Sequence, residues 1–410
     1  MDLHSTLPYW LLKNGLQQAY PPLASDISTE VVIVGGGIAG ALLAQHFGEA
    51  GIDAVLLDKR EVAWGSTSAS TALLQYEIDE PLHKLRETYG KDFADRAYRS
   101  CADAISKIEL LIAKLNADCG FQRKPSIYMA VKESDVDALR KEFVARGEAG
   151  FEVEWLDEDA LRVATGITRP AAIRSACGAQ VDAFLLAHAC LASAADSGVR
   201  ILDRTGVEHC KFYPGGADVT TDRGHTVRCK HVVFATGYEV KDFLKRDIVN
   251  LNSSFAVVTE PLEGAWPKWE NDALIWEMAS PYLYIRSTDD DRIIVGGEDA
   301  GYRNSIVRDG ELPRKAEVLI GKLKELIPQI DPEIAFAWAG TFGETEDGLA
   351  YIGQVEEQPG AHFALGFGGN GITYSILAAE IIRDFLLGKT HEYADLFSFD
   401  RTKNHANHSS

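Results

Sequence analysis

The chain has 410 residues, of which 46% are hydrophobic and 25% charged, and its formal net charge is −20. This length exceeds the ~100–200 residues of an ordinary domain, so we expect two domains in a globular protein. A negative net charge repels phosphate backbones and anionic lipid surfaces, which argues against nucleic acid as a partner. Apolar runs fall short of the ~20 residues of an integral membrane segment, and the N-terminus lacks the pattern of a secretory signal. We therefore expect a cytoplasmic protein.

The six cysteines show neither a CxxC pair nor a His/Cys spacing typical of zinc ligands. They are expected to be reduced and buried. No metal site is predicted.

Two short β-branched runs near the N-terminus predict neighbouring strands of a parallel sheet. Val31–Val34 ends at a glycine triplet, and residues 54–58 form the second run. A helix predicted from Ile38 to about Ala50 joins them, which completes a strand–helix–strand unit of the expected ~30 residues. The sequence therefore predicts a nucleotide-binding fold that follows an N-terminal arm at residues 1–27.

The remaining elements are predicted from apolar spacing and from turn residues. The predicted helices span two segments between Asp79 and Leu115 broken near Gly90, then residues 133–146, 157–163, 182–197, 315–326 and 372–387. The predicted strands span residues 126–131, 200–202, 207–212, 217–221, 226–229, 231–235, 255–259, 282–286, 292–295 and 363–365.

Signals of the nucleotide-binding fold recur in three separate stretches of the chain, which predicts a discontinuous first domain. Its expected pieces are residues 28–90, 165–245 and 338–390. The expected substrate domain comprises residues 91–164 and 246–337, and residues 391–410 form a tail that is polar from Arg401 onwards.

Three glycines between the first strand and its helix match the GxGxxG pattern of dinucleotide-binding folds. Gly35 allows the tight turn, Gly37 lets a pyrophosphate approach the backbone, and Gly40 lets the helix pack on the strand. Asp58 ends the second strand and is placed to accept hydrogen bonds from the adenosine ribose. The residues predicted to bind this half of the cofactor are Gly35, Gly37, Ile38, Ala39, Gly40, Asp58 and Lys59.

The motif alone does not distinguish NAD from FAD, but three later segments favour FAD. Trp64–Ala72 is rich in small hydroxyl residues that suit phosphates and the edge of an isoalloxazine ring. Phe234–Gly237 is similar to the ATG segment of flavoproteins, and Gly366–Ile372 opens a helix whose amides suit a flavin carbonyl. The additional cofactor residues predicted here are Ser66, Thr67, Ser68, Ser70, Thr71, Val207, Thr236, Gly237, Gly340, Gly368, Gly369, Asn370, Gly371 and Ile372.

This ordered set of motifs resembles the D-amino acid oxidase (DAO) superfamily of FAD-dependent oxidoreductases, which includes enzymes like glycine oxidase, sarcosine oxidase and gamma-glutamylputrescine oxidase. Gly178–Leu185 is similar to the superfamily's G-x-x-v-d-p element. Trp338–Gly340 and Asp347–Gly353 are similar to its W-a-G and D-G-l-P-x-i-G signatures, with Ala350 where proline is usual. The resemblance extends from Tyr9 to the final helix.

The resemblance implies a fold of the α/β class. A Rossmann-like, glutathione-reductase-like FAD-binding domain is expected, with an inserted α+β substrate domain built on an antiparallel sheet. It also implies oxidation of a C–N bond of an amino acid or amine by hydride transfer to flavin N5.

The chain departs from the superfamily where many members place an arginine that binds a substrate carboxylate. Residues 341–345 read Thr-Phe-Gly-Glu-Thr. Arg286 is a candidate to replace the missing arginine that binds the substrate carboxylate, because a guanidinium binds a carboxylate through two hydrogen bonds. Glu344 is instead a candidate to receive a substrate ammonium. The aromatic candidates for the site are Tyr76, Tyr284 and Tyr374.

Two further departures concern the flavin. Sarcosine-oxidase-like members attach it to a cysteine near residue 341, and here no cysteine follows Cys229, so noncovalent FAD is expected. The lysine that activates oxygen in those enzymes is not found at residues 292–295, which leaves oxygen or a quinone or carrier protein as the acceptor.

Two other functions stay open at this stage. An FAD-dependent 2-hydroxy acid dehydrogenase needs a base, and His83, His188 and His362 lie in segments not obviously beside the flavin. A non-catalytic flavin-binding or redox-sensing protein is the other alternative.

Overall fold

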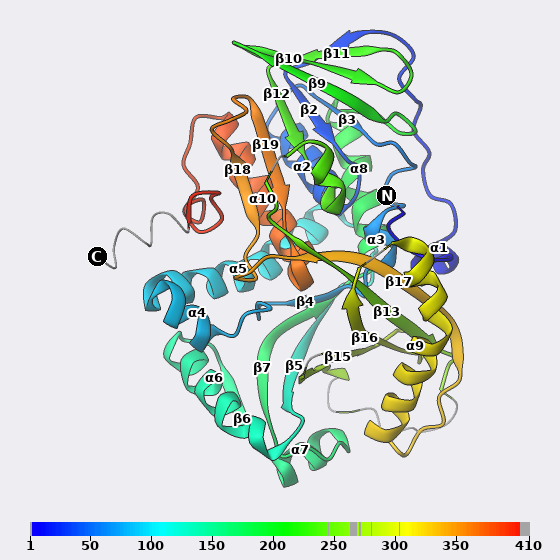
Figure 1. Ribbon diagram of the computed structural model, residues 1–410, viewed down its shortest axis with the longest axis vertical. Coiled ribbons are helices and arrows are strands. Elements are labelled where there is room, and N and C mark those ends of the chain that lie inside the picture. Colours follow the sequence, from blue (N-terminus) through cyan, green and yellow to red (C-terminus); the bar gives the residue numbers. More distant parts are fainter. Residues whose placement is uncertain are drawn as a thin grey trace.

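The computed structural model describes residues 2–244, 246–262, 269, 272–279, 281–302 and 304–401. The chain forms two parts that meet along the middle of the molecule, and three sheets organise them (Figure 1). The remainder of the predicted polar tail, residues 402–410, lies outside the described residues.

The first part is built on a six-stranded, mostly parallel sheet. Its order is β18 (Tyr351–Gln354), β19 (Ala361–Leu365), β12 (His231–Phe234), β2 (Val31–Val34), β3 (Ala54–Leu57) and β8 (Arg200–Leu202). Every neighbouring pair is parallel except β18 with β19. The predicted strand–helix–strand unit is confirmed.

The strands of this sheet are buried on both faces, as continuous β-branched runs predict. Val31 and Ile33 pack in one core with the helices, whereas Val32 and Val34 belong to a second core on the opposite face. The helices of the first face are α2 (Ile38–Glu49), α8 (Ala183–Asp196) and α10 (Gly371–Leu386).

A four-stranded sheet covers the opposite face. Its order is β1 (Ile27–Ser28), β11 (Thr226–Cys229), β10 (Gly216–Thr221) and β9 (Val207–Tyr213). The strands predicted at residues 207–212, 217–221, 226–229 and 231–235 are therefore divided between two sheets. The last run, β12, joins the parallel sheet because Val232, Val233 and Phe234 are apolar on both faces and are fully enclosed there.

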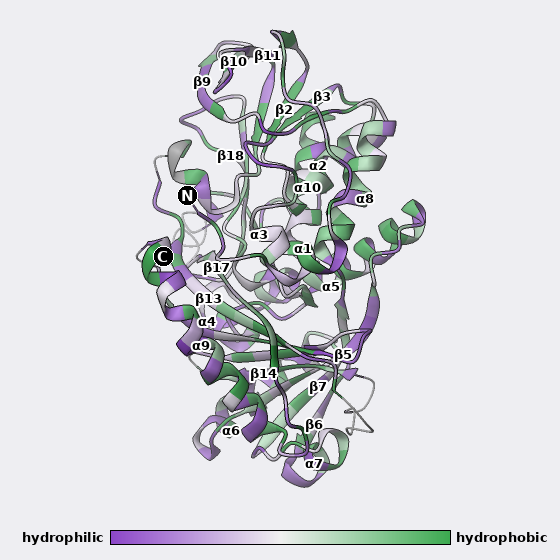
Figure 2. Cartoon of the chain, turned by 90° about the vertical axis from the view of Figure 1, so that its right-hand side faces the viewer, coloured by the Kyte–Doolittle hydropathy of each residue, from purple (hydrophilic) through white to green (hydrophobic). Residues whose placement is uncertain are grey.

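The second part is built on a nine-stranded, mostly antiparallel sheet. Its order is β17 (Ile334–Glu344), β13 (Asn250–Thr259), β16 (Ile293–Gly301), β15 (Leu283–Ser287), β14 (Leu274–Met278), β5 (Gln122–Ala130), β7 (Ala171–Gln180) and β4 (Leu73–Gln75), with β6 (Val153–Asp157) paired to β7. Hydrophobic residues run along its strands (Figure 2). The predicted fold class is confirmed.

Helix α9 (Ser305–Leu326) packs on one face of the large sheet. Phe255, Val257 and Val295 share a core there with Leu319 and Leu323. The helices that surround the rest of this part are α4 (Leu82–Tyr89), α5 (Lys91–Leu115), α6 (Val136–Glu148) and α7 (Glu158–Thr165). The break that separates α4 from α5 falls at Gly90, as predicted.

Several elements differ from the sequence-based expectation. Helix α9 begins ten residues before the predicted residue 315, although it contains Pro313. The side chain of Asn304 caps its start by accepting a hydrogen bond from the amide of Val307 at 3.0 Å. The strands β7, β14 and β17 were not predicted. The predicted domain boundaries also placed β4, β7 and the end of β17 with the nucleotide-binding part, whereas these residues belong to the large sheet.

The C-terminal segment is folded as far as the described chain extends. Leu396 and Phe397 are fully buried, and Arg401 is 1% exposed. The guanidinium of Arg401 donates to both carboxylate oxygens of Asp347, at 2.8 and 2.9 Å. Arg401, the first residue of the predicted polar tail, is therefore part of the folded structure, because a buried carboxylate pairs with it. In the described part of the chain, no helix is long and apolar enough to cross a membrane.

Gly40 is expected to be essential for the packing of α2 on β2. A Cβ atom at Gly40 would lie 1.8 Å from the carbonyl oxygen of Gly35. Gly40→Ala should therefore destabilise the protein by ~1–3 kcal/mol, the usual range for overpacking. Thermal unfolding of the purified variant measures this loss.

Gly310→Ala is the matched control, because Gly310 lies within α9 and a Cβ there would meet no atom within 4 Å. It should raise stability by about 0.5–1 kcal/mol through its higher helix propensity. Equal stability of the two variants would contradict the close-contact role of Gly40.

Candidate active site

One cavity of about 1150 Å³ lies between the two parts of the molecule. The carboxyl ends of β2, β3 and β12 contribute to it from the first part, and the open face of the large sheet contributes from the second. Ligands of doubly wound sheets bind at this edge of the parallel strands. The predicted residues that line the cavity are Gly35, Gly37, Ile38, Ala39, Asp58, Lys59, Ser66, Thr67, Ser70, Thr71, Val207, Thr236, Gly237, Tyr284, Gly340, Glu344, Gly368, Gly369, Gly371 and Ile372.

The glycine motif places the backbone directly against the cavity. Gly35 has φ +106°, and a Cβ there would lie 2.4 Å from the carbonyl oxygen of Ala235. A Cβ at Gly37 would lie 3.0 Å from Thr67 Oγ1. Gly40 does not line the cavity, because its role is the contact between α2 and the turn at Gly35. The space beside Gly37 is therefore kept open for a ligand.

Asp58 is held by two backbone amides at the wall of the cavity. Its Oδ2 accepts a hydrogen bond from the amide of Gly36 at 2.6 Å, and its Oδ1 accepts one from the amide of Arg60 at 2.7 Å. Burial nevertheless raises the pKa of Asp58 to about 6. The neighbouring Lys59 and Arg60 both pair with Glu239, at 2.6 and 3.0 Å.

The hydroxyl of Thr236 supports a dinucleotide at this end of the cavity. Its Oγ1 is buried and has no hydrogen-bond partner in the described part of the chain. A buried polar atom of this kind requires a partner. Together with the glycine turn and Asp58, this unmatched group fits the ADP half of FAD.

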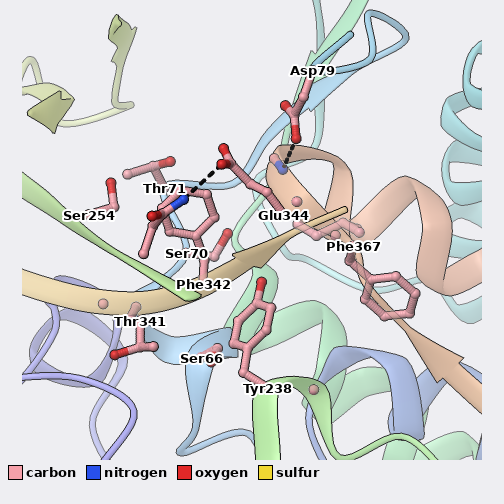
Figure 3. A pocket seen from close by; sticks show the side chains of 18 of the residues that line it. Ser66, Ser70, Thr71, Asp79, Tyr238, Ser254, Thr341, Phe342, Glu344 and Phe367 are labelled. Carbon is pink, nitrogen blue, oxygen red and sulfur yellow. Dashed lines mark hydrogen bonds between the residues drawn. The ribbon is translucent and has the colours of Figure 1, made fainter. Parts of the chain in front are cut away.

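The opposite end of the dinucleotide site is formed by the glycine segment before α10. Gly368 and Gly369 of η4 (Gly368–Asn370) and the start of α10 line the cavity, so the positive end of that helix faces it. The amide of Gly369 donates to Asp79 Oδ2 at 2.9 Å (Figure 3). These residues fit the electron-rich end of a flavin ring.

Two predicted cofactor residues have internal partners and do not line the cavity. Ser68 is fully buried and its hydroxyl donates to the carbonyl of Gly65. Asn370 donates through Nδ2 to the carbonyls of Gln75 and Glu77, at 3.0 and 2.8 Å. Both side chains therefore shape the neighbouring loops rather than contact a cofactor.

Arg286 does not occupy the position expected of a carboxylate ligand. Its Nη1 donates to the carbonyl oxygens of Thr71, Ala72 and Val181 at 3.0–3.1 Å. It shares a face of β15 with Tyr284, but it is 3% exposed and does not line the cavity. The prediction of a substrate clamp at Arg286 is contradicted by this geometry, because the loop at residues 71–72 covers the guanidinium.

Tyr76 and Tyr374 are also core residues rather than cavity residues. The ring of Tyr76 stacks on Phe151 at a centroid distance of 4.5 Å. The hydroxyl of Tyr374 donates to the carbonyl of Gly348 at 2.9 Å. Both are fully enclosed, so neither can contact a substrate.

The face of the large sheet opposite α9 forms the second wall of the cavity. Phe342 and Glu344 of β17 alternate with residues that point towards the core, and so do Asn252 and Ser254 of β13. Tyr284 lies on the same face, where the absence of a side chain at position 296 makes room for its ring. A Cβ at Gly296 would lie 2.4 Å from that ring.

Three carboxylates from different elements share this part of the cavity. They are Asp79, Asp299 and Glu344, and only Glu344 was predicted from the sequence. Burial and, to a smaller extent, the charges of Asp79 and Asp299 together raise the pKa of Glu344 to about 7. Burial also raises the pKa of Asp299 to about 6 and that of Asp79 above its usual value. Figure 3 shows Asp79 and Glu344 in one pocket.

Asp299 reaches the cavity because β16 is irregular before it. The pairing of β13 with β16 shifts register there, and Gly297 and Glu298 have φ angles of +134° and +56°. Such a bulge re-aims the side chains that follow it. The sequence signal was the Gly296–Gly297 pair inside a strand pattern, which is typical of a bulge.

The carboxylates do not form a metal centre. Across the described ranges, no group of three or more His, Cys, Asp or Glu side chains is arranged to hold a metal ion. The cavity therefore combines a dinucleotide site in the first part with an acidic pocket in the second. This combination defines a flavin-dependent oxidoreductase.

Comparison with known proteins agrees with this class. The FAD dependent oxidoreductase (DAO) family matches residues 30–385, so the chain belongs to this family and FAD is its cofactor. The glycine oxidase of Bacillus licheniformis is 26% identical over 395 residues, covering 91% of this chain and 97% of the relative. The gamma-glutamylputrescine oxidoreductase of Escherichia coli (strain K12) is 22% identical over 397 residues, covering 95% and 90%.

Solved structures share the same fold. Glycine oxidase from Geobacillus kaustophilus superimposes with a TM-score of 0.77 at 22% identity, covering 91% of this chain and 99% of that chain. L-proline dehydrogenase from P. horikoshii gives a TM-score of 0.73 at 19% identity, covering 92% and 99%. The resemblance inferred from the sequence motifs is confirmed.

Gly37→Val should yield protein without bound FAD, because the branched side chain fills the space beside Thr67 that a pyrophosphate needs. The ratio of flavin absorbance to protein absorbance after purification measures the loss. Gly147→Val is the control, since Gly147 is exposed and a Cβ there meets no atom within 4 Å. A fully yellow Gly37→Val protein would overturn the assigned site.

Proposed function

We propose that this oxidoreductase oxidises a C–N bond of an amine or amino acid by hydride transfer to flavin N5, and that the cavity selects the substrate through its ammonium group. Bound FAD supplies the hydride acceptor. The names of the relatives, glycine oxidase and gamma-glutamylputrescine oxidoreductase, support nitrogen-containing substrates. The observation that carries the proposal is the group formed by Asp79, Asp299 and Glu344.

Mutual repulsion among these carboxylates favours a cationic ligand. The charges of Asp79 and Asp299 disfavour the charged form of Glu344, and the charge of Asp79 disfavours that of Asp299. A substrate ammonium between them would relieve this repulsion. Oδ1 of Asp299 is buried without a hydrogen-bond partner in the described residues, so one acceptor is available.

The arginines of the cavity are already paired, so neither offers an unengaged guanidinium to a substrate carboxylate; the other cations that line the cavity are Lys59, Lys84 and Lys132. Within the described chain the cavity arginines are Arg60 and Arg146. Arg60 pairs with Glu239, and Arg146 pairs with Glu77 at 3.1 Å and with Glu142 at 2.8 Å. A simple amine therefore fits the pocket better than an α-amino acid does.

Glu344 is proposed first to bind the substrate ammonium and then to accept the proton that this ammonium loses. Its Oε2 accepts a hydrogen bond from Asn252 Nδ2 at 2.7 Å, which orients the carboxylate. The hydride leaves from the carbon beside a neutral amine, because the nitrogen lone pair then stabilises the electron-poor carbon that remains. A carboxylate with a pKa near 7 is suited to take up that proton at neutral pH. Aromatic side chains at Tyr282 and Tyr284 limit the access of water.

A 2-hydroxy acid remains the second candidate substrate because of His83. The sequence did not place this histidine near the site, yet it lines the cavity. Its Nδ1 pairs with Glu142 at 2.8 Å, an arrangement suited to a general base. Neither His188 nor His362 lines the cavity.

Anaerobic reduction of the bound FAD tests the proposal. The purified holoprotein is mixed with alkylamines, diamines, amino acids and 2-hydroxy acids, and flavin bleaching is followed near the usual ~450 nm band. Amines should bleach the flavin fastest. Bleaching by 2-hydroxy acids alone would contradict amine oxidation and support a 2-hydroxy acid dehydrogenase. Bleaching by no compound would favour a non-catalytic flavoprotein. Reoxidation by dioxygen or by a quinone then identifies the electron acceptor.

Glu344→Gln should lower kcat/KM for a cationic amine by about 10–100-fold, since a hydrogen bond to a charged group contributes ~1.5–3 kcal/mol. The pKa of Glu344 is raised to about 7, so the wild-type carboxyl is neutral below that pH and charged above it. Amine binding should therefore strengthen as pH rises through 7 and weaken as it falls.

Stopped-flow reduction at a series of pH values separates this effect from loss of folding. The variant should lose the pH dependence near 7 while retaining full FAD. Glu346→Gln is the matched control, because Glu346 is exposed and does not line the cavity. An unchanged pH profile in Glu344→Gln would exclude the ammonium role.

A further inference from the structure

Four successive backbone carbonyls beside the cavity are each held by a side-chain donor. Trp338 Nε1 donates to the carbonyl of Ala69 at 2.8 Å, and Trp10 Nε1 donates to that of Ser70 at 2.6 Å. Arg286 Nη1 donates to the carbonyls of residues 71 and 72, both at 3.1 Å. The donors come from β17, α1 (Tyr9–Asn14) and β15, so distant parts of the chain converge on one loop.

This arrangement determines which groups of the loop face the cavity. The C=O and N–H of a trans peptide unit point in opposite directions. With the Ser70 carbonyl directed at Trp10, the amide of Thr71 points away from Trp10. The side chains of Ser70 and Thr71 line the cavity. The three donors therefore hold the hydroxyl-rich loop in the orientation that a flavin ring would meet.

The charge on Arg286 is unusual for a buried position. The side chain is 3% exposed, and no carboxylate in the described ranges lies within ion-pair distance of it. Its guanidinium instead faces the ring of Trp10, 5.5 Å from the centroid. Burial lowers the pKa of Arg286 only to about 10, so the group stays charged at neutral pH. An unpaired buried charge is costly, and here the carbonyl dipoles, the ring of Trp10 and the more distant charges of Asp182 and Asp289 offset it.

We propose that Trp10, Arg286 and Trp338 form a carbonyl clamp that positions loop 69–72 against the flavin, and that the buried charge of Arg286 favours negative charge on that flavin. The residues act through the loop and are positioning residues. The inference goes beyond the proposed function. It rests on FAD as the cofactor and is independent of the substrate class.

Sulfite binding tests the electrostatic part without any substrate. Sulfite adds to oxidised flavin at N5, its lone pair forms the N–S bond, and the adduct carries negative charge on the ring. Arg286→Met should raise the sulfite dissociation constant of the holoprotein by at least about tenfold, a modest share of the ~10²–10³ effect of removing a preorganised donor. Arg286→Lys keeps the charge and should stay within about threefold of wild type.

Equal sulfite constants for wild type and Arg286→Met would overturn the electrostatic role, whatever the loss of thermal stability. Equal weakening in the Lys and Met variants would also overturn it, because charge would then not be the cause. Failure of the proposed amine specificity would leave these results unaffected, so the two proposals fail separately.

Trp10→Phe tests the positioning part if Arg286→Met does not retain FAD. The ring is kept and one clamp hydrogen bond is lost, so FAD should dissociate at least about threefold more readily and the visible circular dichroism of the flavin should change. Trp269→Phe is the matched control, because Trp269 Nε1 also donates to a buried carbonyl, that of Ala273, but does not line the cavity. Identical FAD affinity and dichroism in the two variants would refute the clamp.

Discussion

The close approach of Gly40 to the carbonyl of Gly35 is the constraint on which the rest of the molecule depends. A Cβ atom at Gly40 would lie 1.8 Å from that carbonyl oxygen, so any residue other than glycine must displace the turn. This contact brings the start of α2 to the end of β2. The backbone turn, the open space at Gly37 and the carboxylate of Asp58 then meet at one edge of the parallel sheet. FAD binding is thus a consequence of how one helix packs on one strand.

In the large sheet, successive residues of each strand point to opposite faces, so the residues that form the core are separated from those that line the cavity. Residues of the large sheet that point towards α9 are apolar and form a core. Their neighbours along the same strands, such as Asn252, Ser254 and Glu344, face the cavity. A one-residue shift of register would exchange the two sets, so the pairing of β13 with β17 also determines the pocket.

Buried charges are compensated in different ways at the two ends of the cavity. Arg146 lies between Glu77 and Glu142, so its charge is compensated by carboxylates. Arg286 is held mainly by carbonyl oxygens, while none of Asp79, Asp299 and Glu344 forms an ion pair with a basic side chain in the described residues. The charge of Lys315 offsets only part of the rise in the pKa of Asp299. Separated, uncompensated charges of this kind are typical of functional sites, because folding alone would favour pairing them.

The sequence by itself determined the local features of this protein. The glycine turn, the first two parallel strands, the break at Gly90 and the start of α10 each follow from residues that are close together in the chain. These motifs also sufficed to recognise the family, whose match extends over residues 30–385.

Tertiary structure decided which side chains reach the cavity. Arg286 and Tyr284 lie two residues apart on one face of β15, yet only Tyr284 lines the cavity, because a loop from residues 71–72 covers the arginine. Asp79 and Asp299 join Glu344 through loop packing and a bulge. Alternation along a strand predicts the face of a side chain, but what covers that face depends on segments more than a hundred residues away.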